Sequence, residues 1–278
     1  MPGRFRVVTD STSDVPPAWR ERYGIEVVPL RVLFGAEAFR DGVDLTVDQF
    51  FDRLRQVDRL PTTSAPSPGD FASVYERLSH ECDGVVSIHL SGELSGTVEA
   101  ARVGAQQVEG FPVQVIDSRC LTMPVAFLCR VAAEAPSLED AVRCVEERVP
   151  RQRILALLDT LRYLELGGRI GRARALVGAM LDLKPILGVS GGDGRVQPVD
   201  RVRTRSKAIR RLVDLLRSDL PVERLAVMHA QAPDDAEGVR AQLAGELPDV
   251  EVEVGQIGPV LGTHVGPGAV GLVYLKRS

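Results

Sequence analysis

The chain has 278 residues, of which 44% are hydrophobic and 26% are charged, and its formal net charge is −4. This composition is typical of a soluble globular protein long enough for two domains, and it excludes a disordered chain. The small excess of acidic residues offers no basic surface, so we expect no nucleic-acid partner.

The amino-terminal segment becomes polar within about ten residues, so it lacks the apolar core of a signal peptide. No apolar run reaches the roughly 18 to 20 residues that span a bilayer, and we expect no stable membrane insertion. The four cysteines show neither zinc-ligand spacing nor a disulfide framework. We therefore expect a reduced, cytoplasmic protein without a metal or cofactor.

β-rich runs and helical patterns alternate through the first half of the chain. The predicted strands cover 4–12, 25–35, 83–91 and 111–118, and the predicted helices cover 41–57, 67–81, 94–110, 122–135 and 137–150. Thr46 or Asp44 is the expected N-cap of the first helix, and Gly110 the expected end of the third. Alternation of this kind predicts βαβ units around a parallel sheet.

The second half has a different pattern, and Pro150 with the charged residues after it marks a reasonable boundary. Two β-like runs flank Gly191–Gly194, which predicts a hairpin because glycine readily adopts positive φ. Helices are predicted at 204–219 and 232–247, and strands at 224–230 and 268–276. We therefore expect an α/β domain over 1–150 and an α+β domain over 151–278.

Four segments rich in small hydroxyl side chains lie beside predicted strands: Thr9–Asp14, Pro61–Pro68, Leu90–Thr97 and Gly262–Gly268. Ligands of open α/β sheets bind beyond the carboxyl ends of the strands, so these predicted loops are candidates for lining a crevice. Ser, Thr, Asp and Pro also cap helices and form turns, which is the alternative for any one loop. Four such loops in one chain favour a binding site.

Ser95 and Thr97 stand at the start of a predicted helix, where they can cap the helix or donate to an anion at its N-terminus. The segment is not a P-loop, because no Gly-Lys-Ser/Thr follows its glycine. It is not a nucleophile elbow either, because Glu93 stands where that motif requires glycine.

His264 is flanked by glycines in a predicted loop, from which its ring can approach a ligand. His80 and His89 lie in a predicted helix end and a predicted strand, and we expect both to be structural.

Gly167, Gly168 and Gly171 alternate with arginines, but they lack the strand-turn-helix context of a dinucleotide fingerprint. The apolar residues that follow, among them Met180 and Ile186, are typical of a core or of an apolar pocket wall.

The order of these motifs resembles that of the DegV family of bacterial lipid-binding proteins. The matching segments are "VVTDSTSD", "TTSAPSPGDF", "IHLSGELSGT", "VIDS", "LELGGRIGR", "KPIL", "VRTRSKA" and "GTHVGPGAVGLVY". The resemblance implies a Rossmann-like parallel-sheet domain and an α+β domain with a long-chain fatty acid buried between them. It also implies that the ligand carboxylate is held by Thr63, Ser64 and Ser95, with His264 nearby.

The resemblance further implies that Arg169 and Arg203 lie near the carboxylate entrance, and that a separate ATP-dependent fatty acid kinase receives the bound acid and makes an acyl phosphate. The basic run around Arg203 is otherwise a solvated face or a docking surface for an acidic partner. Ala65 and Val98 depart from the family pattern, which often has glutamine and an aromatic residue there.

The leading hypothesis is therefore a fatty-acid-binding protein that is not an enzyme. The alternative from another class is a phosphotransfer enzyme or phosphocarrier subunit in which His264 is phosphorylated, a hypothesis that depends on analogy between folds. A serine hydrolase ranks third, because the sequence offers no plausible catalytic triad around Ser95.

Overall fold

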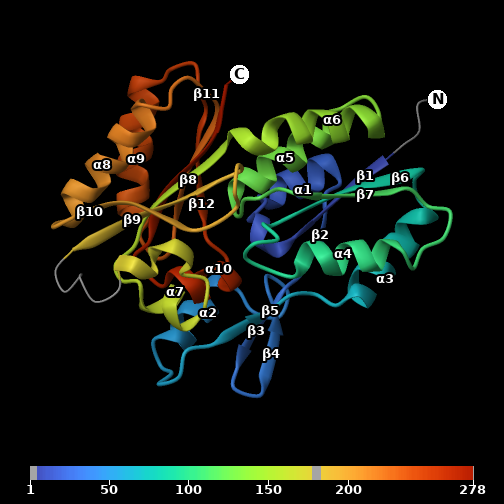
Figure 1. The fold of residues 1–278 in the computed structure, drawn as a ribbon, viewed down its shortest axis with the longest axis horizontal. Helices are drawn as coiled ribbons and strands as arrows, with labels where there is room; N and C mark the ends of the chain where they lie inside the picture. The colour runs from blue at the N-terminus through green and yellow to red at the C-terminus, as the bar shows by residue number, and fades with distance from the viewer. Residues whose placement is uncertain (1–4, 177–182, 278) are drawn as a thin grey trace.

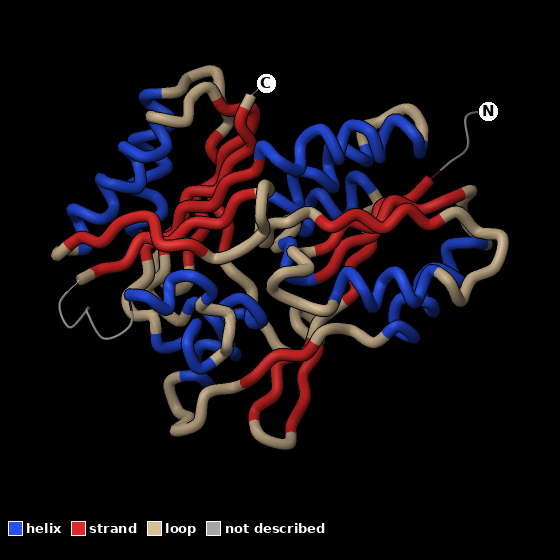
Figure 2. The backbone as a smooth tube through the Cα atoms, in the orientation of Figure 1, coloured by secondary structure: helices blue, strands red, loops and turns tan. Residues whose placement is uncertain are grey.

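The computed structural model describes residues 5–176 and 183–277. Two large β-sheets lie side by side with helices packed on them, and a small third sheet lies below (Figure 1). Figure 2 shows the strands of each sheet as a separate red layer. The fold is the expected α/β arrangement, with a parallel-sheet part followed by an α+β part.

The first sheet is fully parallel, with the order β2-β1-β6-β7. Its strands are β1 (Phe5–Asp10), β2 (Glu26–Val28), β6 (Gly84–His89) and β7 (Val113–Asp117). Its helices are α1 (Pro17–Tyr23), α3 (Pro68–Ser79), α4 (Thr97–Ala105), α5 (Met123–Ala133) and α6 (Leu138–Arg148), with a 3₁₀ turn η1 (Ser11–Ser13).

Both faces of this sheet are covered, and its two central strands, β1 and β6, are buried over most of their length. Val8 and Val85 pack under α3 and α4, whereas Val7 and Val86 face α5 on the other side. The carboxyl ends of β1 and β6 meet at one edge, so the loops after these strands become neighbours.

The second sheet is mixed, with the order β10-β9-β8-β13-β11-β12, and only β11 and β12 are parallel. Its strands are β8 (Gln152–Leu157), β9 (Lys184–Ser190), β10 (Gln197–Val202), β11 (Val222–His229), β12 (Val252–Gln256) and β13 (Val270–Lys276). The connecting segments are η2 (Val149–Arg151), α7 (Arg162–Leu166), η3 (Gly171–Leu176), α8 (Arg205–Arg217), α9 (Pro233–Glu246) and α10 (Pro259–Val265).

The two faces of the mixed sheet have different neighbours, as side-chain alternation requires. Leu155 and Leu157 of β8 pack in the core with α8 and α9. Ile154 and Leu158 point the other way, into the core shared with α5 and α10. Ile186 belongs to the first of these cores, and Met180 lies outside the described residues. The second face is the one from which a ligand site between the two halves can be built.

A small antiparallel sheet contains β3 (Arg31–Phe34), β4 (Glu37–Arg40) and β5 (Thr62–Ser64), and α2 (Val47–Leu54) follows β4. Thr46 caps α2 in a capping box with Gln49, which confirms one of the two expected N-caps.

Several expected elements differ from the structure. The apolar run 25–35 is two strands of different sheets, because Pro29 has no N–H to continue a ladder. The segment 61–68, expected to be a loop, contains β5, and the helix expected to end at Gly110 ends at Ala105. The strands β4 and β12 are not predicted from the sequence, since both are short and half polar.

The strands of the parallel sheet end at residue 117 and those of the mixed sheet begin at residue 152. The predicted boundary at residue 150 falls between them and stays a prediction. Within the described residues, we find no helix with the length and hydropathy to cross a membrane.

Candidate functional site

A cavity lies between the inner face of the mixed sheet, α10 and the loops of the amino-terminal half. The space inside it that the centre of a water molecule can occupy has a volume of about 130 Å³. This is roughly ten times the volume that a single water requires on the same measure. Its lining residues are Leu30, Thr63, Ala65, Leu90, Leu94, Ser95, Leu121, Thr122, Ile154, Ala156, Leu158, Leu164, Arg169, Leu187, Gly188, Val189, Val196, Met228, Ile257, Val260, Leu261, His264, Val265, Ala269, Val270, Gly271 and Val273.

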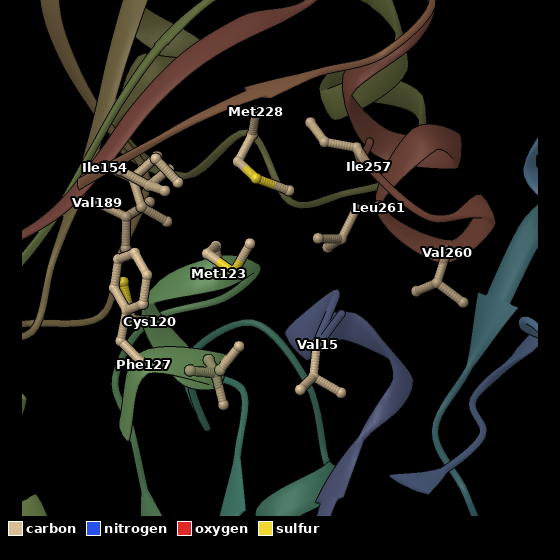
Figure 3. Packing of buried hydrophobic residues seen from close by; sticks show 14 of the residues in the cluster. Val15, Cys120, Met123, Phe127, Ile154, Val189, Met228, Ile257, Val260 and Leu261 are labelled. Carbon is tan, nitrogen blue, oxygen red and sulfur yellow. The ribbon is translucent and has the colours of Figure 1, made fainter. Parts of the chain in front are cut away.

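The lining is mostly aliphatic and comes from segments far apart in the sequence. Figure 3 shows Met228 of β11 and Met123 of α5 projecting toward the same region, beside Ile257 and Leu261. Among the described lining residues, five side chains are polar: Thr63, Ser95, Thr122, Arg169 and His264. A pocket of this composition suits a ligand that is largely apolar and polar at one place.

Thr63 and His264 are joined across the cavity wall. Thr63 Oγ1 lies 2.9 Å from His264 Nε2, a hydrogen bond between β5 and α10. Removal from water, and then the nearby Arg169 guanidinium, lower the pKa of His264 to about 4. The imidazole is therefore neutral at neutral pH, and it is held in one orientation.

The expectation that His264 lies in a loop is wrong, because the residue occupies the last turn of α10. The glycines around it suggest a loop, but Pro259 at the start of the helix and two carboxylates favour helix. Asp14 accepts a hydrogen bond from Gly258 N, and Asp41 accepts one from Val260 N.

Ser95 and Arg169 form a second part of the polar wall. Arg169 Nε donates to Leu94 O at 3.2 Å, and its Nη1 donates to Gly167 O at 2.8 Å. Ser95 precedes Gly96, the N-cap of α4, and its hydroxyl bonds to Thr97 Oγ1 at 2.8 Å. The capping interpretation of Ser95 is therefore wrong.

Two of the expected site residues lie apart from this group. Ser64 is the neighbour of Thr63 on β5, and strand alternation turns it to the opposite face, away from the lining. Arg203 is exposed between β10 and α8 and does not line the cavity.

Thr122 lines the cavity and is not predicted from the sequence. Its φ of 52° is a strained conformation for a β-branched residue, and its hydroxyl donates to Asp14 Oδ2 at 2.6 Å. The signal that points to it is Asp14 at the end of the "TDSTSD" motif, since that carboxyl holds both Thr122 and Gly258.

The carboxyl groups behind this wall have raised pKa values. Removal from water raises the pKa of Asp14 to about 8, although the bonds from Thr122 and Gly258 favour its charged form. Burial likewise raises the pKa of Asp41 to about 6. Asp14 is therefore largely protonated at neutral pH and acts as a neutral hydrogen-bonding group.

A fully buried carboxylate, Asp10, ties the loops after β1 and β6 together. Its oxygens accept hydrogen bonds from Thr12 N and Leu90 N, both at 3.0 Å, and one lies 3.0 Å from His89 Nδ1. His89 also contacts Ser87 Oγ at 2.7 Å, which fits its expected structural role.

The loop after β6 also reaches the other half of the protein. Ser91 Oγ donates to Gly194 O, in the turn of the β9–β10 hairpin, at 2.8 Å. Asp10 thus fixes the loop that carries Ser95, and Ser91 connects that loop to the mixed sheet.

The arrangement offers hydroxyls, a neutral imidazole and one guanidinium to the polar end of a ligand, and aliphatic walls to the rest. Among residues 5–176 and 183–277, no group of three or more His, Cys, Asp or Glu side chains could hold a metal ion. The site therefore has the chemistry of a pocket for an amphipathic anion.

We predict that Asp14→Asn reduces the loss of stability between pH 4 and pH 8. The folded protein binds the Asp14 proton up to about pH 8, and the unfolded chain releases it near pH 4, so wild-type stability falls with pH over this window. Without a charge, asparagine can still accept from Gly258 N through Oδ1 and can donate from Nδ2 to Thr122 Oγ1. Urea unfolding at pH 5 and pH 8 measures the difference.

The control is Asp58→Asn, the same change at an exposed loop carboxylate. If the free energy of unfolding of Asp14→Asn and of the wild type changed by the same amount between pH 5 and pH 8, the assignment of a proton to Asp14 would be contradicted.

Residues 4–277 match the model of the DegV family, which is described as a family of uncharacterised proteins. A DegV domain-containing protein of Streptomyces coelicolor is 40% identical over 286 aligned positions that cover all of both chains. A fatty-acid-binding DegV family protein from Thermus thermophilus has a similar structure, with a TM-score of 0.91, 34% identity and coverage of 99% of this chain and 100% of the other. The structure of DegV of Bacillus subtilis, also a fatty-acid-binding protein, has a TM-score of 0.90, with the same identity and coverage. The chain belongs to the DegV family.

Proposed function

We propose that this protein binds a long-chain fatty acid in the cavity between its two halves and has no catalytic activity of its own. The observation that carries the proposal is an aliphatic cavity whose few polar side chains include Thr63, Ser95, Arg169 and His264. Fatty acid binding by the similar proteins of Thermus thermophilus and Bacillus subtilis supports it.

The apolar walls dominate the expected affinity. Burying about fifteen methylenes at roughly 0.8 kcal/mol each gives on the order of 12 kcal/mol before the loss of ligand freedom. A hydrogen bond to the carboxylate adds only about 1.5 to 3 kcal/mol. The polar side chains therefore fix where the head group lies, and the acyl chain supplies most of the binding.

We assign the carboxylate to the hydroxyls of Thr63 and Ser95, with the Arg169 guanidinium beside them. His264 Nδ1 is buried and has no hydrogen-bond partner among the described residues, and an orphaned N–H is rarer than an orphaned acceptor. We therefore place the ring proton on Nε2, where it donates to Thr63 Oγ1 and leaves the Thr63 O–H free for the ligand. Ser64 lies on the other face of β5, so among the residues expected to bind the carboxylate it has the least structural support.

Delivery to an ATP-dependent fatty acid kinase in the cytoplasm completes the proposal. Hydroxyl donors orient a carboxylate without tight ion pairing, and the nearby Arg169 guanidinium already donates through Nε and Nη1 to the carbonyl oxygens of Leu94 and Gly167. This arrangement leaves the carboxylate reactive toward phosphoryl transfer. Arg203 is exposed and makes no ion pair with the described residues, so its charge is free for a partner. The four cysteines are free thiols, as a reducing compartment maintains them.

No observation favours the phosphocarrier alternative. A phosphorylated histidine must present a ring nitrogen to its donor, but His264 Nδ1 is buried and Nε2 is bonded to Thr63. The low pKa of His264 reports the same enclosed environment.

We predict, from the resemblance to the fatty-acid-binding DegV proteins, that the purified protein carries a fatty acid of about 14 to 18 carbons, which has about 12 to 16 methylenes to bury. Mass spectrometry of an organic extract identifies it. A lipid-free protein that also fails to bind added palmitate, or a phosphohistidine in its place, would overturn the proposal.

We predict that Thr63→Val lowers the affinity for palmitate about tenfold, because it removes a hydrogen bond to a charged group and keeps the side-chain shape. Thr62→Val is the matched control: Thr62 is the exposed neighbour on β5 and does not line the cavity. Titration calorimetry compares the two, and equal affinities would remove Thr63 from the site. Ser64→Ala, measured alongside, tests the remaining hydroxyl.

We predict that Arg203→Glu slows acyl-phosphate formation by a fatty acid kinase about fivefold at limiting protein, while lipid binding is unchanged, because surface charges act mainly on association. Arg210→Glu, at an exposed position of α8, is the control. Loss of lipid together with normal coupling to the kinase would count against a docking role for Arg203.

A further inference from the structure

The cavity face of the mixed sheet contains a row of four laterally paired residues on four adjacent strands. Leu187 of β9 pairs with Ala156 of β8, Ala156 with Gly271 of β13, and Gly271 with Met228 of β11. All four line the cavity. The two in the middle have the smallest side chains, so the row forms a trough between Leu187 and Met228.

The backbone does not require glycine at position 271. Its φ lies outside the left-handed region, and an added Cβ would lie 3.2 Å from Leu155 O and 3.7 Å from Ala156 Cβ, which needs only a small adjustment. Gly188, on β9, is different, because its Cβ would meet Val199 Cγ2 at 2.8 Å. Glycine inside a strand weakens the strand and often marks a close approach of a ligand.

Ala156 gives a second, independent sign of open space. It is the last residue but one of β8, a central strand of the sheet, yet it is only half-buried, while Ile154 and Leu157 on the same strand are buried. The space above it is the cavity itself.

The strand order places the Leu187 end of the trough on the side of β10 and the Met228 end on the side of β12. Arg169 and Val196 line both the cavity and an adjoining surface pocket, and Arg172 N donates to Val196 O just before β10. The far side is closed by Met228, whose side chain covers Gly255 of β12. A chain that enters beside Arg169 crosses β9, β8 and β13 in turn, over about three strand spacings or roughly 14 Å.

We propose that Ala156 and Gly271 determine which acyl-chain lengths the protein accepts, by leaving the trough open to the methylenes of the ligand. This inference rests on the proposed fatty-acid function and assigns its length selectivity to two positions. Gly271, on β13, lies one strand farther from the Leu187 end of the trough than Ala156, on β8. A larger side chain at position 271 therefore excludes only the longer acids, and a larger side chain at position 156 also excludes shorter ones.

The expected effects follow from the methylenes displaced. Each methylene that leaves apolar surroundings lowers the affinity about fourfold. Gly271→Val and Ala156→Leu each add three carbons to the trough. If two to three methylenes are displaced, chains that reach the trough lose roughly 15- to 60-fold in affinity, and chains that stop before it lose little.

The test measures dissociation constants for saturated acids of 10, 12, 14, 16 and 18 carbons with the wild type, Gly271→Val and Ala156→Leu. We expect the affinity of Gly271→Val for the two longest acids to fall at least tenfold, with less than a threefold change for the shortest. For Ala156→Leu, the fall begins at a shorter chain. The matched controls are Gly238→Val and Ala241→Leu, the same changes at exposed positions of α9.

Thermal unfolding without ligand separates selectivity from misfolding, and Gly271→Ala, which adds one carbon, replaces Gly271→Val if that variant unfolds. Folded variants that keep wild-type affinity for long acids, or that lose affinity equally for every length, overturn the inference and leave the proposed function intact. A wild-type protein that binds none of the acids overturns the proposed function itself.

Discussion

The carboxylate of Asp10 is the constraint on which the site depends. It is completely excluded from solvent, so each of its oxygens needs hydrogen bonds, and the chain supplies them from Thr12 and Leu90 backbone N–H groups. Meeting that need fixes the loops after β1 and β6 against each other. The first loop then presents Asp14 to α10, and the second presents Ser91 to the hairpin and Ser95 to the cavity.

The cavity combines two unlike surfaces. One wall is a regular sheet face, where pairing register decides which side chains are neighbours. The other consists of loops and a short helix, held in place by hydrogen bonds to Asp14 and Asp41. A sheet gives a smooth apolar surface for methylenes, and irregular backbone lets hydroxyls converge on one point. Neither surface alone could do both.

Much of this architecture could be predicted from the sequence. Alternation of strands and helices gives the parallel sheet, and the glycines at 191–194 give the hairpin, because both are local patterns. The hydroxyl-rich segments contain Thr63, Ser95 and His264, the resemblance adds Arg169, and all four line one cavity. That they bind a carboxylate stays a prediction. Their convergence depends on strand ends meeting at a sheet edge, which topology dictates.

The remaining features depend on long-range contacts that no local pattern reveals. The helical state of His264 is set by carboxylates more than 200 residues away in the chain. Ser64 misses the cavity because β5 pairs with β3 and alternation then turns it outward. Thr122 resembles an ordinary helix cap until its partner Asp14 is known, and Gly271 resembles any strand glycine until its neighbours in the register are known.

The position of β13 has a consequence for how the protein is made. This strand is the last in the chain order of the described residues, yet it lies in the middle of the mixed sheet, between β8 and β11. The segment just before it, α10, supplies His264. The inner face of the mixed sheet, and with it the cavity, is therefore complete only once residues 259–276 have been added to the chain. A chain truncated before them exposes the apolar face of an unfinished sheet.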